Sequence, residues 1–353
     1  MNVDFILAGR GLAGSVLALQ LLRAGYSVVS IDDPSISNCS RVSAGMINPL
    51  GFRKISHSWR ALEALEIAQN FYQQLEEFSG RRFFHQTGMG RIFGTEHEAI
   101  HWNSFALQDE FSADLGLAGS FEPGPHVNAP FGAAMIKTAA SVDMLAFLAA
   151  AQEVLAPNTQ LVQDKFVADE VEFSHNGVIY REFTARGLVL CEGWRNTENK
   201  WFADLPLRPA KGEILTVKAE GLPDIPFSGG VFVLPAGNNV YKIGSTYEWG
   251  QKDEIPTPHQ RADLEKRLAH LIRIPFEVVS QEAGIRPTVS DRRPLVGRHP
   301  RIPQLYIFNG LGTRGTMLAP MLASQMVEFM GNNTPVSSEC SIGRFKQHHE
   351  TVG

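Results

Sequence analysis

The pattern of hydrophobic positions at the start of the chain predicts a strand, a glycine-rich turn and a helix. Residues 3–8 form a short apolar run, and residues 15–24 carry apolar side chains at helical spacing. Gly25 follows where such a helix would end, and a second β-branched run over residues 26–31 leads to Asp32. This order is typical of the strand–turn–helix unit that opens a dinucleotide-binding domain.

Further along the chain, amphipathic spacing predicts helices, and short apolar or alternating runs predict strands. The expected helices cover residues 59–78, 142–155, 260–272 and a stretch that ends at Met330, and the expected strands cover residues 159–162, 177–180, 188–190 and 305–308. Residues 81–130 show no clear period and are expected to be irregular. Between residues 208 and 246, short strands alternate with Gly, Pro and Asn, which favours a mixed or antiparallel sheet.

These elements predict an α/β (α+β) chain of two interleaved domains. A length of 353 residues suits two domains, and no low-complexity linker separates them. The first domain is expected to be Rossmann-like and to bind the cofactor through residues 1–80, 141–207 and 276–353. The second is expected to bind the substrate on the mixed or antiparallel sheet, and it takes residues 81–140 and 208–275.

The composition narrows the class of protein. The chain carries 32 Lys and Arg against 37 Asp and Glu, a net charge of −5, which argues against non-specific binding to nucleic acid or anionic lipid. No apolar stretch approaches the roughly 18 residues that span a bilayer, and the N-terminus has no basic region of a cleavable leader. The three cysteines are widely spaced and show no metal-binding pattern. We therefore expect a cytoplasmic protein with no metal site, no membrane span and no nucleic-acid partner; a homo-oligomer stays open.

The turn after the first strand has the spacing Gly9-x-Gly11-x-x-Gly14, which is typical of a dinucleotide site. The first glycine permits a tight turn, the second lets the backbone approach a pyrophosphate, and the third allows close helix–strand packing. The N-terminus of the following helix offers free N–H groups and a positive dipole to the phosphates. The cofactor contacts expected in this turn are Gly9, Gly11, Leu12, Ala13 and Gly14.

An acidic residue at the end of the second strand favours the same interpretation. Asp32 lies 21 residues after Gly11, where a carboxylate can accept hydrogen bonds from a ribose diol. Asp33 is the alternative, because a sequence defines the end of a strand only to within a few residues. An acid at this place would repel a 2′-phosphate, so NADP is disfavoured. The turn alone does not distinguish NAD from FAD.

Three later segments distinguish the two cofactors. They are residues 40–46 (SRVSAGM), residues 284–288 (GIRPT) and residues 309–320 (NGLGTRGTMLAP). In this order they resemble the D-amino-acid oxidase superfamily of FAD-dependent amine oxidoreductases, which includes glycine and sarcosine oxidases. The resemblance covers nearly the whole chain and implies that FAD is the cofactor.

The resemblance also implies which residues contact FAD. The first segment would run beside the flavin, main-chain groups of Val167 would hold the adenine, and Gly193 would lie near the diphosphate. The last segment would lie under the pyrimidine end of the isoalloxazine, where the following helix favours negative charge. The small residues that relatives carry before Gly193 are replaced here by Cys191 and Glu192. The implied contacts are Ser40, Ser43, Ala44, Gly45, Met46, Val167, Gly193, Gly312, Thr313, Arg314, Gly315, Thr316 and Met317.

Two arginines and a lysine are the implied catalytic residues. Arg286 occupies the position at which related amino-acid oxidases grip the substrate carboxylate, and its planar guanidinium can donate two parallel hydrogen bonds. Arg314 is a second candidate for the same pocket. Lys242 matches a lysine that faces the flavin in sarcosine-oxidase-like members, where a cation promotes reoxidation by oxygen. A solvent-facing strand lysine is the alternative for Lys242.

The activity implied by the resemblance is the oxidation of a small amine or amino acid. A hydride would pass from Cα to flavin N5, and water would then hydrolyse the imine. Oxygen, or a quinone or electron-transfer partner, would accept the electrons. Two other functions stay open: an FAD-dependent enzyme that acts on a modified tRNA base, and a non-catalytic flavin-binding subunit of a larger complex.

Overall fold

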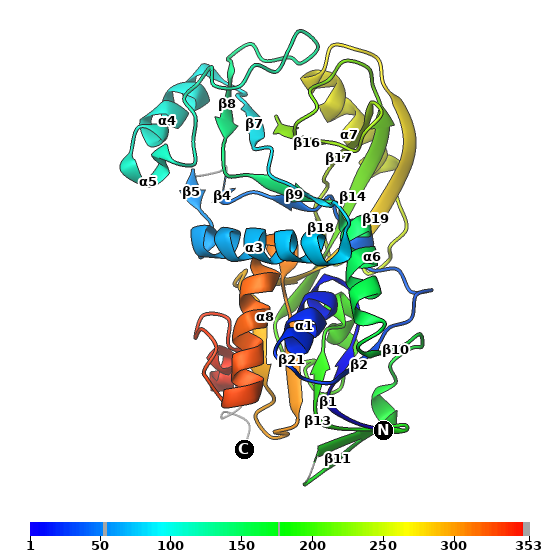
Figure 1. Ribbon diagram of the computed structural model, residues 1–353. Helices are drawn as coiled ribbons and strands as arrows, with labels where there is room; N and C mark the ends of the chain where they lie inside the picture. The colour runs from blue at the N-terminus through cyan, green and yellow to red at the C-terminus, as the bar shows by residue number, and fades with distance from the viewer. Residues whose placement is uncertain (52–54, 176, 349–353) are drawn as a thin grey trace.

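The computed structural model describes residues 1–51, 55–175 and 177–348, which form two lobes built around two large sheets. In Figure 1 the lobe that contains the N-terminus lies below helix α3 (Ala61–Ser79), and the lobe of the second sheet lies above it. Each sheet takes strands from distant parts of the sequence, so the chain passes between the lobes several times.

The first sheet has a parallel centre in the order β10-β2-β1-β13-β21. Parallel strands need crossover connections, which place helices on the faces of the sheet. The parallel strands are β1 (Asn2–Ala8), β2 (Val28–Ile31), β10 (Gln160–Val162), β13 (Phe183–Leu190) and β21 (Leu305–Asn309). Antiparallel strands extend the sheet: β11 (Val171–Ser174), β12 (Gly177–Tyr180) and β20 (Leu295–Arg298).

Strand β1 is buried on both faces, which explains its unbroken apolar sequence. Phe5 and Leu7 belong to a core that four helices form with this face of the sheet, whereas Ile6 and Ala8 belong to a second core on the opposite face. The four helices are α1 (Leu12–Arg23), α3, α6 (Met144–Leu155) and α8 (Gly315–Asn332). Packing on both faces therefore holds the sheet, and with it the ends of its strands, in place.

In the second sheet, β17 and β18 both pair with one edge of β14, and β19 pairs with its opposite edge. Beyond β17 the strand order is β16-β15-β7-β8. Strands β14 and β19 run antiparallel from Leu207 opposite Val289 to Lys218 opposite Glu277. Helix α7 (Pro258–Leu271) packs on one face of this sheet through Leu264 and Leu268. The strands are β7 (Met89–Ile92), β8 (Ala133–Ile136), β14 (Leu207–Lys218), β15 (Phe227–Ser228), β16 (Phe232–Pro235), β17 (Val240–Gly244), β18 (Glu248–Trp249) and β19 (Glu277–Val289).

Short elements join the lobes and cover their sides. One small sheet consists of β3 (Met46–Ile47), β9 (Ala140–Val142) and β6 (Phe84–His85). A second consists of β4 (Leu50–Gly51) and β5 (Ser56–His57). The short helices are α2 (Cys39–Val42), α4 (Glu96–Ala106) and α5 (Asp109–Ser112). The 3-10 turns are η1 (Ala168–Glu170), η2 (Gly193–Glu198), η3 (Gly312–Arg314) and η4 (Ile342–His348).

The structure confirms the predicted fold class, a nucleotide-binding sheet interleaved with a largely antiparallel sheet. The expectation that residues 81–130 are irregular was wrong, because helix α4 forms there after Thr95 caps it by accepting a hydrogen bond from the Glu98 N–H. Strand β19 falls within the range expected for the first domain, yet it pairs with β14 of the second sheet. The domain boundaries themselves stay a prediction. No helix among the described residues has the length and hydropathy needed to cross a bilayer.

Candidate functional site

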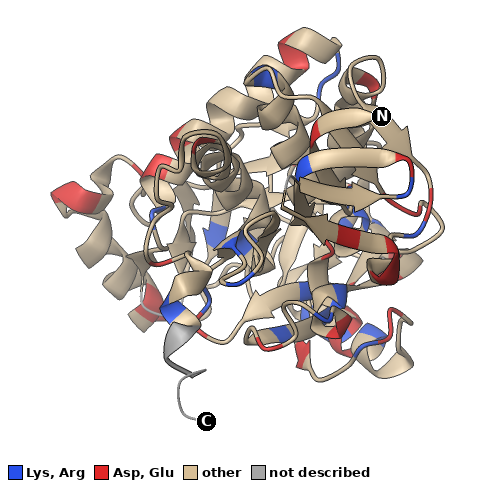
Figure 2. Cartoon of the chain, turned by 90° about the horizontal axis from the view of Figure 1, so that it is seen from below, with Lys and Arg blue, Asp and Glu red and all other residues tan. Residues whose placement is uncertain are grey.

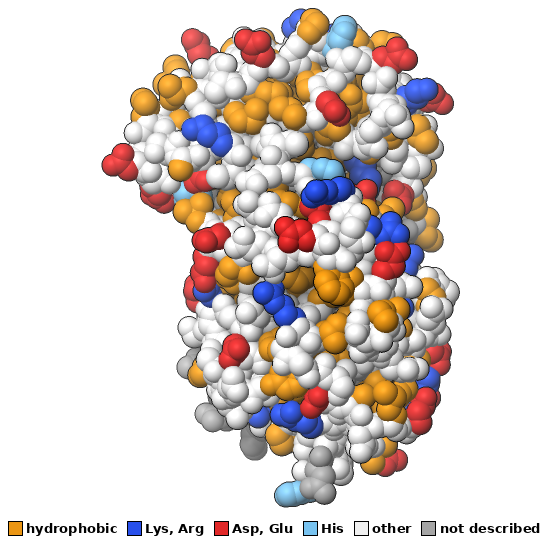
Figure 3. Space-filling view, in the orientation of Figure 1, with side chains coloured by type: hydrophobic (Ala, Val, Ile, Leu, Met, Phe, Trp, Pro, Cys, Tyr) orange, Lys and Arg blue, Asp and Glu red, His pale blue; other side chains and the backbone are white. Residues whose placement is uncertain are grey.

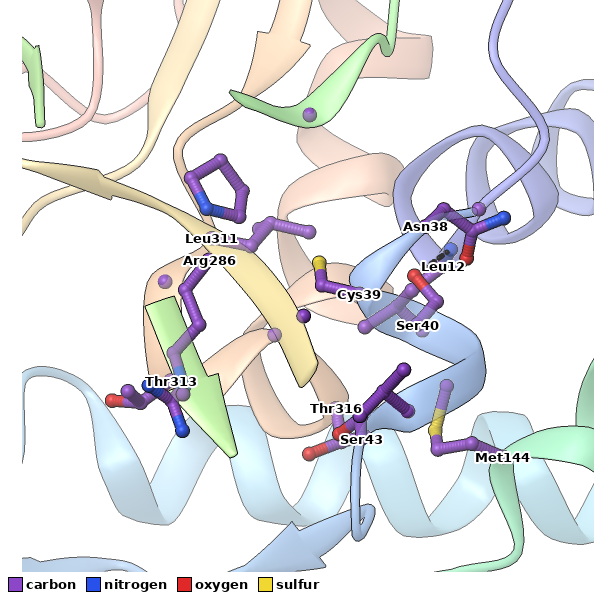
Figure 4. A pocket seen from close by; sticks show the side chains of 18 of the residues that line it. Leu12, Asn38, Cys39, Ser40, Ser43, Met144, Arg286, Leu311, Thr313 and Thr316 are labelled. Carbon is purple, nitrogen blue, oxygen red and sulfur yellow. Dashed lines mark hydrogen bonds between the residues drawn. The ribbon is translucent and has the colours of Figure 1, made fainter. Parts of the chain in front are cut away.

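A cavity of about 670 Å³ lies where the parallel strands of the first sheet end and the second sheet begins. Gly9 follows β1, Asp32 follows β2, Glu192 follows β13 and Asn309 closes β21, and all four line the cavity. The carboxyl ends of parallel strands are where open α/β sheets bind their ligands. In Figure 4, Leu12, Asn38 and Ser40 lie at one end of the view, Arg286 and Thr313 lie at the other, and Cys39 lies between them.

The glycine turn has the geometry that a dinucleotide site requires. Gly9 has a φ of +98°, and a Cβ on it would lie 2.6 Å from the Cys191 carbonyl oxygen. A Cβ on Gly14 would overlap the Gly9 carbonyl oxygen, so the start of α1 packs directly on the turn. Gly11 caps α1 without a side-chain hydrogen bond. The Leu12 N–H donates to the Ser40 hydroxyl, so the N–H groups of Ala13 and Gly14 are the ones that this turn leaves for an anion.

Asp32 lies at the cavity wall beside this turn. Its Oδ1 accepts a hydrogen bond of 2.9 Å from the Arg10 N–H, which fixes the carboxyl group. Burial raises the pKa of Asp32, although the Arg10 N–H and guanidinium oppose the shift. Asp33 also lines the cavity, but its Oδ1 accepts hydrogen bonds from both the N–H and the hydroxyl of Ser35. Asp32 is therefore the better placed of the two predicted acids.

Helix α2 and the residues after it form the wall opposite the glycine turn. The Ser40 hydroxyl accepts a hydrogen bond of 2.9 Å from the Leu12 N–H, so α2 is tied to the start of α1. The Ser43 hydroxyl accepts from the Gly45 N–H at 3.1 Å, and both residues line the cavity. Thr316, at the start of α8, donates to the Met46 carbonyl at 3.3 Å. A second helix N-terminus thus borders the same space.

Glu192 is a carboxyl group inside the cavity that the family pattern does not contain. Its Oε2 accepts a hydrogen bond of 2.8 Å from the Asn199 side-chain amide. Burial raises the pKa of Glu192 to about 7, while Asn199 and Arg195 act in the opposite direction. At neutral pH a large fraction of this group is protonated, so it can donate as well as accept a hydrogen bond.

Arg286 provides a partly buried positive charge at the other end of the cavity. It projects from β19, and its Nη2 donates to the Ser245 hydroxyl at 2.8 Å while its Nη1 donates to the Thr246 carbonyl at 3.3 Å. Burial lowers the pKa of Arg286, but a guanidinium stays charged in proteins. Within residues 1–51, 55–175 and 177–348, no carboxylate forms an ion pair with it. A partly buried cation without a carboxylate partner favours an anionic ligand.

Arg314 also lines the cavity, but its guanidinium is engaged with the protein. Nη1 donates to the Asn48 carbonyl and the Ser58 hydroxyl, each at 2.8 Å, and Nη2 donates to the Leu50 carbonyl at 3.3 Å. These bonds tie Asn48, Leu50 and Ser58 to the turn before α8. Arg314 therefore shapes the wall, and fewer of its donors are left for a substrate than at Arg286.

A buried polar network holds the segment that carries the partners of Arg286. Glu213 is fully buried and accepts hydrogen bonds from the N–H and hydroxyl of Thr257 and from the Gln281 amide. Lys211 is 1% exposed and donates to Asp253 and to the Ile255 carbonyl, each at 2.6 Å. The Glu213 N–H also donates to the Thr246 hydroxyl at 2.9 Å. The 245–257 segment is thereby fixed against β14.

Most of the predicted site residues line this one cavity. Three do not line it: Gly14, Val167 and Lys242. Gly14 packs behind the turn, and the Val167 N–H donates to the Tyr180 hydroxyl at 3.2 Å. Lys242 lies on β17 two residues before Gly244, which does line the cavity. Lys165 and Phe166 line the cavity next to Val167. The predicted residues that line it are Gly9, Gly11, Leu12, Ala13, Asp32, Asp33, Ser40, Ser43, Ala44, Gly45, Met46, Gly193, Arg286, Gly312, Thr313, Arg314, Gly315, Thr316 and Met317.

Sequence reasoning missed the wall that the second sheet supplies. Gly212 and Ile214 of β14, Phe232 of β16 and Ser245 after β17 all line the cavity. Alternate residues of these strands face it, but no local motif marks them. One available signal was the run Lys211-Gly212-Glu213, in which two charged residues and a glycine stand directly before the apolar pair Ile214-Leu215.

Residues 4–329 match the family described as FAD dependent oxidoreductase, which covers most of the chain. The chain belongs to this family. The geometry fits the cofactor, because the glycine turn, two helix N-termini and a fixed acid for a ribose meet in one cavity.

Two curated relatives cover nearly all of the chain. The tRNA 5-methylaminomethyl-2-thiouridine biosynthesis bifunctional protein of Marinobacter nauticus is 22% identical over 378 residues, which include 98% of this chain. The chain spans only 59% of the length of that protein. Glycine oxidase of Geobacillus kaustophilus is 24% identical over 366 residues, which cover 92% of this chain and 93% of the oxidase.

Solved structures show the same fold. A crystal structure of glycine oxidase from Geobacillus kaustophilus has a TM-score of 0.81 at 21% identity, covering 95% of this chain and 96% of that one. Iminodiacetate oxidase from Chelativorans sp. BNC1 has a TM-score of 0.77 at 19% identity, covering 92% and 94%. The two-sheet arrangement is therefore shared with known oxidases.

Proposed function

We propose that the protein oxidises a small amine or amino acid that carries a carboxylate next to its CH–NH group. The observation that carries this proposal is the partly buried Arg286 guanidinium, which lines the cofactor cavity without a carboxylate partner among the described residues. A bidentate pair with a carboxylate would compensate the desolvated charge. The names of two relatives, glycine oxidase and iminodiacetate oxidase, are consistent with such a substrate.

The chain's own residues would contribute binding, orientation and exclusion of water. The glycine turn and the start of α1 would hold the diphosphate of FAD, and Asp32 would accept the ribose hydroxyls. The start of α8 would support negative charge on the bound cofactor. Arg286 would fix the carboxylate so that the Cα–H of the substrate faces the cofactor. Such positioning supplies up to about 7–11 kcal/mol in favourable systems.

FAD, when bound, supplies the two-electron oxidation of the C–N bond to an imine. The substrate would lose one C–H and one N–H bond; FAD, if bound, would take up the two electrons and one proton, and the second proton would leave to water. Water then adds to the imine and yields a carbonyl compound with ammonia or an amine. Oxygen, or a quinone or electron-transfer partner, would regenerate the cofactor. Lys242 does not line the cavity, so its part in regeneration stays a prediction.

The test is the visible spectrum of the purified yellow protein, recorded without oxygen while single compounds are added. We expect an amino acid or N-alkyl glycine to bleach the flavin band. The Arg286→Ala variant should keep FAD and require a much higher concentration of the same compound. A flavin band that no member of the panel bleaches would contradict the proposal, and unchanged kinetics in Arg286→Ala would remove this arginine from the site.

A second candidate function is the oxidation of an amine on a modified tRNA base. The relatives named as tRNA 5-methylaminomethyl-2-thiouridine biosynthesis bifunctional proteins support it, since one of them matches 98% of the chain. Against it stand the net charge of −5 and the mixed charges in Figures 2 and 3, where basic and acidic residues are interspersed along the chain and on the face shown. A mobility shift of bulk tRNA that weakens steeply with salt would favour this candidate, and its absence would leave the small-molecule reaction.

A further inference from the structure

We propose that Gly212 and Tyr247 are positioning residues for Arg286: together they hold its guanidinium at one place in the cavity. This inference rests on the proposed function, in which Arg286 binds a substrate carboxylate. It assigns roles to two residues that the glycine turn and the flavin segments do not predict.

Gly212 provides the surface on which the guanidinium lies. It belongs to β14, opposite Gly284 of β19, and Arg286 is two residues further along the same face of β19. A Cβ built on Gly212 would overlap Cζ and both Nη atoms of Arg286. Because β14 and β19 are paired on both sides of Gly212, β14 has little room to move away from Arg286. Any side chain at position 212 must displace the guanidinium.

Tyr247 contacts the same group from the segment after β17. Its ring centroid lies 5.4 Å from Arg286 Cζ, within the range of a cation–π contact. Tyr247 as a whole residue is 46% exposed, so it is not part of a packed core. The two residues before it, Ser245 and Thr246, accept hydrogen bonds from Nη2 and Nη1 of Arg286. Three consecutive residues thus contact one guanidinium.

The remaining donors of Arg286 are the ones that a ligand can use. A guanidinium carries five N–H donors, and the described protein acceptors are Ser245 and Thr246. Its side chain runs toward Thr313 in Figure 4, and Thr313 lines the cavity. An arginine that is held in place loses less conformational entropy when it binds a carboxylate. We therefore expect both positioning residues to set the affinity for carboxylates.

The probe is methoxyacetate, a carboxylate of the size of N-methylglycine that has no oxidisable amine, and methoxyacetamide is its uncharged counterpart. Each is titrated into the FAD-loaded protein while the visible flavin spectrum is followed. Arg286→Ala should weaken methoxyacetate binding about tenfold to a hundredfold, the usual effect of losing hydrogen bonds to a charged group. Methoxyacetamide binding should change little.

The variants of the two positioning residues are compared with matched controls. Gly212→Ala should weaken methoxyacetate binding nearly as much as Arg286→Ala, and the double variant should bind no worse than Arg286→Ala alone. Tyr247→Leu should weaken binding several-fold, whereas Tyr247→Phe, which keeps the ring, should match the wild type. Since Tyr247 is half-exposed, this pair remains informative if Gly212→Ala fails to fold.

The outcomes separate the inference from the function on which it rests. If Arg286→Ala binds methoxyacetate as the wild type does, the proposed carboxylate site is wrong. If Arg286→Ala weakens binding but Tyr247→Leu and a folded Gly212→Ala do not, the positioning roles are wrong and the carboxylate site stands. Additive losses in the Gly212→Ala, Arg286→Ala double variant would also overturn the role of Gly212.

Discussion

Replacing Glu192 by glutamine should change how the stability of the FAD-free protein depends on pH. The carboxyl group lies in the cavity beside Asn199 and Arg195, and burial raises its pKa from 4.5 to about 7. Between these values the folded protein keeps a proton that the unfolded chain has lost. The unfolded state therefore binds fewer protons, and stability falls as the pH rises through this window.

The size of this effect follows from the pKa difference. The full shift of the Glu192 pKa would correspond to at most about 3.5 kcal/mol, since each pKa unit corresponds to about 1.4 kcal/mol. Water that enters the cavity reduces it, so we expect about 1–3 kcal/mol between pH 4.5 and pH 7. Glu192→Gln has the same shape and cannot titrate, so it should lose this part of the pH dependence.

The assay is urea unfolding of FAD-free wild type and Glu192→Gln, followed by tryptophan fluorescence at pH 5, 6, 7 and 8. Asp33→Asn serves as the control, because this acid at the same cavity lies near the protein surface and already bonds Ser35. The difference between wild type and Glu192→Gln should grow with pH up to about 7 and then level off. Parallel curves for the two proteins over the whole range would refute the reasoning.

Three further predictions concern the cofactor wall. Asp32→Ala should weaken FAD binding about tenfold by removing a ribose acceptor, measured by quenching of flavin fluorescence; an unchanged dissociation constant would assign the ribose to another group. Arg314→Ala should destabilise the protein by about 2–4 kcal/mol in urea, because it leaves the acceptors on Asn48 and Leu50 unpaired; a loss confined to substrate binding would speak against this structural role. Gly14→Ala should destabilise by about 1–3 kcal/mol and weaken FAD binding, since its Cβ would overlap the Gly9 carbonyl; equal melting temperatures would show that α1 can shift freely.

The cofactor half of the site could be predicted because its residues are close together in sequence and carry a recognisable spacing. The turn from Gly9 to Gly14 and the acid at Asp32 depend on one strand, one helix and the next strand. Local backbone geometry decides their positions, and local geometry leaves a pattern in the sequence. The same holds for the turn before α8, which enters a helix directly after a buried strand.

The substrate half could not be predicted in the same way. Gly212, Tyr247 and Arg286 come together only because β14 pairs with β19 on one edge and with β17 and β18 on the other. No spacing within the sequence encodes that pairing. Glu192 was visible as a departure from the family pattern, but its protonation depends on burial that only the folded cavity creates. Helix α4 was missed because its exposed residues include Ile100, which obscures the amphipathic period.

The alternation along β14 limits how the length of this strand can change. Gly212 and Ile214 face the cavity, while Lys211 and Glu213 project to the other side and hold the 245–257 segment. Deleting or inserting one residue upstream in this strand would exchange the two sets, placing a lysine and a glutamate against the cofactor and breaking the clamp at the same time. Variation in length among relatives should therefore accumulate in loops such as residues 219–226, and attempts to broaden the substrate range should substitute β14 side chains without altering its residue count.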